Sequence, residues 1–211
     1  MNTFVFGLQR TATNYVHHLL WKNFNCFARQ PSSSKEPLWK HTPTPLTVFD
    51  QGLIPDDSMI VVVSKDPVMW VDSLIRKPMD ADKCFESGDE EPTVSLRNKK
   101  IPLRKIVEYW NNYNTAWAPY IDNDPRISTV SQKVLVDGAT RSAWLNELAK
   151  KHGLKFQEGE AVDIEITPLS RDFDEKVKQT YRDQITEFLS EEQRDFIMEH
   201  ANMNLFERLY E

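Results

Sequence analysis

The segment Met59-Ile-Val-Val-Val63 constrains the fold most, because it is apolar at every position. A strand with one solvated face alternates apolar and polar side chains, whereas a strand covered on both faces does not. We therefore expect a central parallel strand with helices on both sides of its sheet. A helix is expected from about Val68, and another has a buried stripe from Ile106 to Trp117 and ends near Tyr120.

The rest of the chain continues this alternation of strands and helices. Residues 3–8 form a strand candidate, and apolar side chains recur at helical spacing from Tyr15 to Phe24. The other expected elements are a short strand at 37–41, a strand within 127–136, a helix that ends at Gly153, a helical stripe from Val177 to Phe188, and a last helix that starts at the capping box Ser190-Glu-Glu-Gln193. Strands alternating with helices in this way are typical of a three-layer α/β/α sandwich with a mostly parallel central sheet.

Length and charge limit the function classes. The 211 residues suit a single domain, 1–211, and the 40% hydrophobic content is enough for a sizeable core. A net charge of −6 argues against nonspecific binding of nucleic acid or anionic membrane, so any anion must be bound by a local cluster. With no targeting or membrane-spanning pattern, we expect a cytoplasmic protein, in which Cys26 and Cys84 are reduced, packed thiols.

Residues 79–101 are expected to form a mobile loop. Their first half is acidic, their second half is basic, and almost no apolar periodicity is present. Long segments of this kind often cover a substrate. The alternative is an insertion that contacts nothing.

The segment Gly7-Leu-Gln-Arg-Thr-Ala-Thr-Asn14 lies between the first strand and the first helix, where an α/β protein binds phosphate groups. Backbone N–H groups at the helix start would face an anion, and Arg10 adds a fixed positive charge. Neutral donors are expected from the side chains of Thr11, Thr13 and Asn14. The alternative is a threonine that simply caps the helix.

These residues resemble the first motif of the P-loop sulfotransferases, which use 3′-phosphoadenosine 5′-phosphosulfate (PAPS) as sulfuryl donor. That motif is a strand, then Lys or Arg, Ser or Thr, Gly, Thr, Thr and an aromatic residue. The matching run here consists of Arg10, Thr11, Ala12, Thr13, Asn14 and Tyr15. Ala12 stands where the family has Gly. The resemblance implies a fold like that of the P-loop nucleoside triphosphate hydrolases, PAPS as the donor, no required metal, and an adenine ring stacked on Tyr15.

The family's second motif is a buried strand that ends in a basic residue, followed by Pro and then by Ser on the next helix. Here Met59–Val63 leads to Lys65, Pro67 and Ser73, and the eight residues from Lys65 to Ser73 equal the family's spacing. A lysine at a strand end and a serine two helical turns later can face one phosphate group. The resemblance assigns both residues to the ribose 3′-phosphate, with Lys65 in place of the usual Arg.

His41 is the candidate general base, because imidazole titrates near neutral pH and Trp39-Lys-His-Thr-Pro43 resembles the segment that holds the family's catalytic histidine. Glu36 is the alternative base, since other members use Glu. Arg10 and Lys40 are expected to stabilise the charge on the bridging oxygen. Adjacent His17 and His18 point about 100° apart on a helix, which argues against a metal site there.

The sequence thus predicts a sulfotransferase that acts on a hydroxyl or amino group of a small-molecule, sugar or lipid acceptor. Two alternatives stay open. One is a nucleotide-dependent phosphotransferase in which Asp66 holds Mg²⁺, although the Lys of the standard phosphate loop is missing. The other is a noncatalytic nucleotide-binding module.

Overall fold

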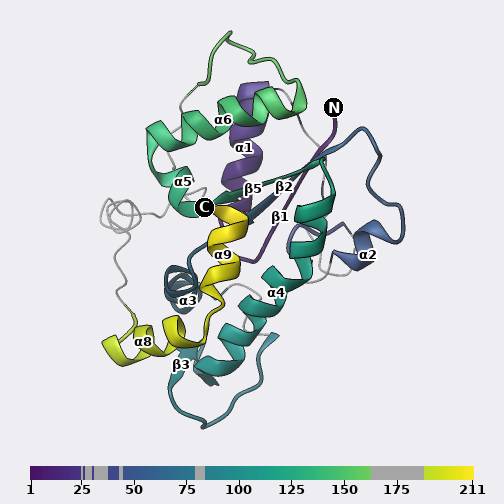
Figure 1. The fold of residues 1–211 in the computed structure, drawn as a ribbon. Helices are drawn as coiled ribbons and strands as arrows, with labels where there is room; N and C mark the ends of the chain where they lie inside the picture. Colours follow the sequence, from purple (N-terminus) through teal and green to yellow (C-terminus); the bar gives the residue numbers. More distant parts are fainter. Residues whose placement is uncertain (25, 27–29, 31–37, 43–44, 79–83, 163–187) are drawn as a thin grey trace.

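A three-stranded parallel sheet organises the chain (Figure 1). The computed structural model describes residues 1–24, 26, 30, 38–42, 45–78, 84–162 and 188–211. Strand β2 (Met59–Ser64) lies between β1 (Thr3–Gly7) and β5 (Ile127–Ser131). Its burial on both faces confirms the prediction of a central parallel strand.

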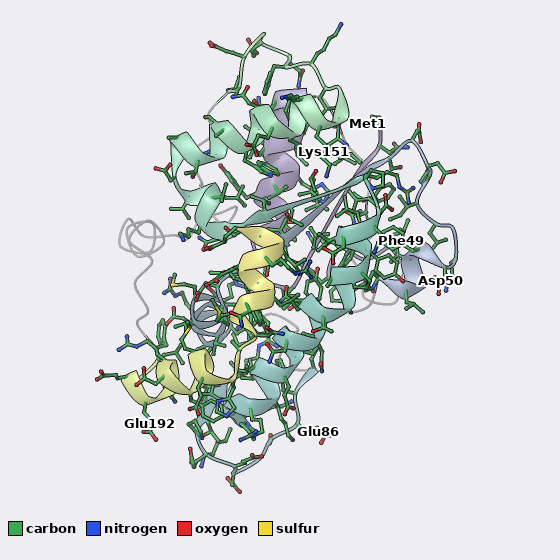
Figure 2. All side chains as sticks on the ribbon, viewed as in Figure 1. Met1, Phe49, Asp50, Glu86, Lys151 and Glu192 are labelled. Carbon is green, nitrogen blue, oxygen red and sulfur yellow. The ribbon has the colours of Figure 1, made fainter. Side chains whose placement is uncertain are left out.

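Two apolar clusters, one on each face of the sheet, form the core. Val61 and Val63 of β2 belong to one cluster, and Ile60 and Val62 belong to the other, as the period of two in a strand requires. The first cluster is covered by α1 (Thr13–Phe24) and α6 (Gly138–His152), and the second by α3 (Pro67–Arg76), α4 (Leu103–Asn123) and α9 (Met203–Tyr210). Figure 2 shows side chains filling the space between the sheet and these helices. The fold is therefore of the α/β class.

The smaller elements extend this core. They are α2 (Leu46–Phe49), α5 (Gln132–Val136), α8 (Glu191–His200) and an antiparallel hairpin of β3 (Thr93–Leu96) and β4 (Lys99–Pro102). The capping box predicted at Ser190 is present, and Gly153 ends α6 in the left-handed conformation, as expected. Helix α9 was not predicted, and the helical stripe expected from Val177 lies outside the described residues except for Phe188.

The hairpin corrects the prediction of a loop over 79–101. Val94, Leu96 and Ile101 are buried in the main core, and Phe85 joins them. The left-handed conformations of Arg97 and Asn98 form the tight turn. Each strand of the hairpin has only four residues, which is too few to show a clear alternation of apolar and polar side chains in the sequence. Residues 79–83 lie outside the described part of the chain.

The strand expected within 127–136 is present, whereas the short strand expected at 37–41 is wrong for its described residues, 38–41. The strand expected within 127–136 ends at Ser131, whose hydroxyl caps α5 by accepting from the Val134 amide at 3.4 Å. Val134, Leu135 and Val136 therefore lie on α5 and not on the strand. Residues 38–42 of the other candidate form a turn, in which the Thr42 amide donates to the Trp39 carbonyl.

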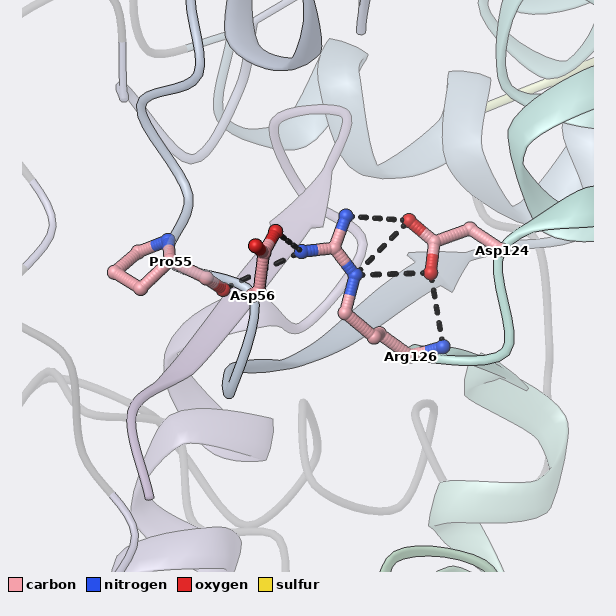
Figure 3. Close-up of polar contacts among 4 residues, drawn as sticks. All are labelled: Pro55, Asp56, Asp124 and Arg126. Carbon is pink, nitrogen blue, oxygen red and sulfur yellow. Dashed lines mark hydrogen bonds and ion pairs between the residues drawn. The ribbon is translucent and has the colours of Figure 1, made fainter.

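Arg126 ties the amino ends of β2 and β5 together (Figure 3). Its guanidinium donates three hydrogen bonds of 2.7 to 3.2 Å to the carboxylate of Asp124 and one of 3.3 Å to the carbonyl of Pro55, and lies 3.5 Å from Asp56. The hydrogen bonds from Arg126 lower the pKa of Asp124. These contacts fix the end of the sheet opposite to the candidate site. Within the described residues, no helix combines the length and the apolar character needed to span a membrane.

Candidate anion-binding site

Two loops meet at the carboxyl edge of the parallel sheet. Gly7 of β1 is paired in register with Val63 of β2, so the segment that follows each strand starts at the same level. The first segment runs from Leu8 to Ala12 and enters α1, and the second, Lys65 and Asp66, enters α3. Ligands of open α/β sheets bind at this edge.

The first loop makes a tight turn that depends on small residues. A Cβ atom at Gly7 would lie 2.6 Å from the carbonyl oxygen of Val63 and 2.5 Å from the hydroxyl of Thr11, so only glycine fits. Arg10 and Ala12 have φ angles of 73° and 71°. The left-handed conformation at Ala12 is one that glycine adopts without the strain it causes in alanine.

Three buried residues donate hydrogen bonds to the carbonyl groups of the two loops. The amide and hydroxyl of Thr11 both donate to the Leu8 carbonyl, at 3.2 and 2.7 Å. The indole N–H of Trp70 donates to the carbonyl of Gln9 at 2.8 Å, and that of Trp110 donates to the carbonyl of Lys65 at 3.1 Å. These hydrogen bonds fix the directions in which the loop carbonyl groups, the negative ends of the peptide dipoles, point. The arrangement favours an anion at the edge, since the first amides of α1 have no acceptor within the helix.

Lys65 and Ser73 form the buried pair that the spacing predicted. The ammonium group of Lys65 donates to the Ser73 hydroxyl at 2.5 Å, and this hydroxyl donates to the Met69 carbonyl at 2.9 Å. Lys65 has no exposed surface, and Ser73 is 7% exposed. The structure therefore brings together a side chain that follows β2 and one from α3, at the same edge of the sheet as the first loop.

Positive charge gathers around this pair. Burial, followed by the charges of Arg10 and Arg76, lowers the pKa of Lys65 to about 7, against the opposing effects of Asp72 and Asp66. Arg76 is paired with Asp72 at 3.0 Å. Burial and repulsion by neighbouring cations destabilise the charged form of Lys65, whereas a nearby anion stabilises it. Binding of a phosphate or sulfate group would therefore raise the pKa of Lys65.

Asp66 caps helix α3. One of its carboxylate oxygens accepts from the amides of Val68 and Met69, at 2.9 and 3.1 Å. Burial raises the pKa of this carboxyl group, and the two amide bonds oppose the shift. The structural role of Asp66 accounts for its position after β2 without a metal ion.

Residues 38–42, here called the arm, dock on the open edge of β1. The Gly7 amide donates to the Lys40 carbonyl at 3.0 Å, and Nδ1 of His41 lies 2.7 Å from the Gly7 carbonyl oxygen. The ammonium group of Lys40 donates to the side-chain oxygen of Asn14 at the start of α1. The arm thus brings both predicted catalytic side chains, Lys40 and His41, to the first loop.

His41 in the arm and His17 beside it are neutral at pH 7. Burial lowers the pKa of His41 to about 4, and the charge of Lys40 contributes to the shift against the bond to Gly7. Because a carbonyl oxygen can only accept, Nδ1 of His41 carries the proton and Nε2 carries the lone pair. Burial and the charge of Lys40 also lower the pKa of His17 to about 4, and His17 in turn affects His41.

Other predicted site residues have structural roles instead. Tyr15 is 7% exposed and packs in the core cluster under α1, which leaves its ring no open face for adenine. The hydroxyl of Thr11 donates within the loop and is not directed to a ligand. Cys84 is exposed, contrary to the expectation of a packed thiol, while Cys26 is buried. Glu36 lies outside the described residues.

Sequence reasoning missed Trp70, Trp110 and His17. All three lie on helices, where an aromatic side chain ordinarily indicates the core, and Trp70 and Trp110 are indeed buried. Only the distance from each indole nitrogen to a loop carbonyl assigns the tryptophans to the site.

Comparisons with protein families, with curated proteins and with solved structures find no match to this chain. In the part of the chain that the structure describes, no three His, Cys, Asp or Glu side chains form a group able to hold a metal ion. The chemistry of the site therefore has to be argued from its own geometry.

Replacing Ala12 by Gly should stabilise the protein by about 0.5–1 kcal/mol, because the left-handed conformation strains alanine and not glycine. Chemical denaturation measures the difference. The control is Ala143→Gly, on an exposed position of α6, which should destabilise by about 1 kcal/mol. Equal losses from both variants would contradict the assigned loop conformation.

Trp70→Phe should weaken the binding of sulfate roughly fivefold, since the Gln9 carbonyl loses its donor while the ring is largely kept. Thermal stability measured against sulfate concentration, with chloride at equal ionic strength as reference, gives the affinity. Trp117→Phe is the matched control, because the buried Trp117 indole nitrogen makes no hydrogen bond in the described structure. The same loss of affinity in both variants would refute a specific role for Trp70.

Lys65→Met should raise the free energy of unfolding by ~1–3 kcal/mol at pH 6, because methionine removes the cost of a buried charge. The folded-state pKa of about 7 lies below the unfolded value, so the wild type gains stability as pH rises above 7. The advantage of the variant should therefore shrink between pH 7 and 9, by at most about 1.4 kcal/mol per pH unit. Lys133→Met, on an exposed lysine, should show no such pH dependence.

Proposed function

We propose that this chain is a PAPS-dependent sulfotransferase that transfers a sulfuryl group to a hydroxyl or amino group of a small-molecule, sugar or lipid acceptor. The observation that carries the proposal is the buried contact between Lys65 and Ser73, with the charge of Arg10 close to it. A buried, partly discharged lysine beside a serine is costly unless it serves a ligand. The α/β fold with this pair at the carboxyl edge supports a fold like that of the P-loop hydrolases.

Two separate anion positions favour a doubly charged nucleotide. The Lys65–Ser73 pair would hold the ribose 3′-phosphate, and the first loop with Arg10 would hold the 5′-phosphosulfate at the start of α1. Thr13 and Asn14 lie in the first turn of α1 and contribute their amides. No step of this binding depends on a metal ion.

The residues of the arm supply the chemistry. The neutral His41 takes a proton at Nε2 from the acceptor while the acceptor oxygen or nitrogen forms a bond to sulfur. The bond between sulfur and the bridging oxygen breaks, and adenosine 3′,5′-bisphosphate leaves with the electron pair. Arg10 and Lys40 stabilise the negative charge on that oxygen. The acceptor becomes more acidic as it bonds to sulfur, which suits a base with a pKa of about 4.

The two alternatives lose support from the same geometry. A phosphotransferase would use Asp66 for Mg²⁺, but this carboxylate already accepts two amide bonds of α3. A noncatalytic module would not need a neutral histidine whose Nδ1 is held by the Gly7 carbonyl beside the loop. The sulfotransferase function accounts for both the buried pair and the arm.

Calorimetry with adenosine 3′,5′-bisphosphate, AMP and ATP, in EDTA and then in Mg²⁺, tests the proposal. The bisphosphate should bind tightly without metal, AMP should bind at least about tenfold more weakly because it lacks the 3′-phosphate, and Arg10→Ala should lose affinity for both. A preference for ATP that appears only with Mg²⁺ would favour the phosphotransferase.

His41→Ala provides the control for chemistry. It should leave the bisphosphate affinity unchanged and lower turnover of the acceptor by at least about a hundredfold. Unchanged turnover would exclude His41 as the base.

A further inference from the structure

Two amides on the open edge of β1, those of Val5 and Gly7, find acceptors outside the sheet. Strand β1 pairs with β2 on one side, and the amides of Val5 and Gly7, two residues apart, point to the other side. Gly7 finds its acceptor in the arm, at the carbonyl of Lys40. Val5 finds a side-chain acceptor instead, because its amide donates to Oε1 of Gln30 at 2.8 Å.

Gln30 also holds the arm. Its amide nitrogen donates to the Leu38 carbonyl at 3.3 Å, so one side chain joins the edge of β1 to the first residue of the arm. It is hydrogen-bonded to His17 as well. Together with the contacts of Gly7, this gives the arm two anchoring points on β1, one at each of its ends.

We propose that Gln30 is a positioning residue, which fixes the arm against β1 and so keeps His41 and Lys40 at the anion loop. Its hydrogen bonds to Val5 and Leu38 require an acceptor and a donor on one side chain, and an amide supplies both. Gln30 takes no part in the chemistry itself. The expected role of Gln30 in turnover rests on the proposed function, whereas its role in holding the arm on β1 does not.

The anion loop itself does not depend on Gln30. Lys65 and Ser73 lie on the segment after β2 and on α3, and Trp70 and Trp110 hold the loop carbonyls from α3 and α4. Loss of Gln30 should therefore release the arm and leave nucleotide binding unchanged.

Among the described residues, the charged or titratable groups that affect His41 are Lys40 and His17.

The test compares Gln30→Ala and Gln30→Glu with Gln157→Ala as matched control. Gln157 also bonds two backbone groups, but these are the carbonyls of Trp21 and Lys22, at the far end of α1. Nitrogen NMR of the histidine rings reports the tautomer and titration of His41 in each full-length protein, and calorimetry reports the affinity for adenosine 3′,5′-bisphosphate. Glutamate keeps the acceptor for Val5 and loses the donor to Leu38, so Gln30→Glu tests the donor even if the alanine variant does not fold.

In Gln30→Ala the His41 titration should move upward from about 4 by at least ~1 pH unit, because the released ring is hydrated. Turnover should fall at least about tenfold, with the bisphosphate Kd within about twofold of wild type. Gln157→Ala should change neither. An unchanged His41 titration in both Gln30 variants would overturn the proposal. A wild type that neither binds the bisphosphate nor turns over would refute the proposed function instead, and the NMR result would still decide the role of Gln30.

Discussion

The cost of burying Lys65 is the constraint on which the site depends. A lysine without exposed surface loses its hydration, and its pKa falls to about 7 although Asp72 and Asp66 are near. Evolution toward stability alone would replace such a residue with an apolar one. An anion bound between Lys65, Ser73 and Arg10 would offset the free energy that burial of the lysine costs. The chain as a whole carries −6, so this cluster is a local feature and not part of a basic surface.

The sheet explains how the cluster is built. Because β1 and β2 are parallel and in register, the segments after Gly7 and Ser64 start side by side, and side chains from distant parts of the chain converge there. Trp70 on α3 and Trp110 on α4 then donate hydrogen bonds to a carbonyl of each segment. The arm approaches from the free edge of β1, so the proposed anion position and the proposed general base belong to different parts of the structure.

The sequence was sufficient wherever a local rule determined the structure. The apolar run of β2, the Ser190 capping box and the Gly153 cap were predicted, and so was the pairing of Lys65 with Ser73, from helical spacing after a strand. It was insufficient where a tertiary contact decides. The packing of Tyr15, the helix after Ser131 and the burial of the hairpin depend on neighbours far away in the chain. The bonds from Gln30 and Trp70 to backbone groups likewise leave no pattern in the sequence.

Proton uptake on ligand binding tests the central claim, that Lys65 is the donor for a phosphate group, most directly. Adenosine 3′,5′-bisphosphate is titrated at pH 8 in buffers of different ionisation enthalpy, with wild type and Lys65→Arg. Since free Lys65 has a pKa of about 7 and a bound anion restores its charge, the wild type should take up close to one proton. Lys65→Arg should bind with little uptake, because the guanidinium stays charged. Tight binding without proton uptake in the wild type, or equal uptake in both proteins, would contradict the assignment of Lys65 to the phosphate.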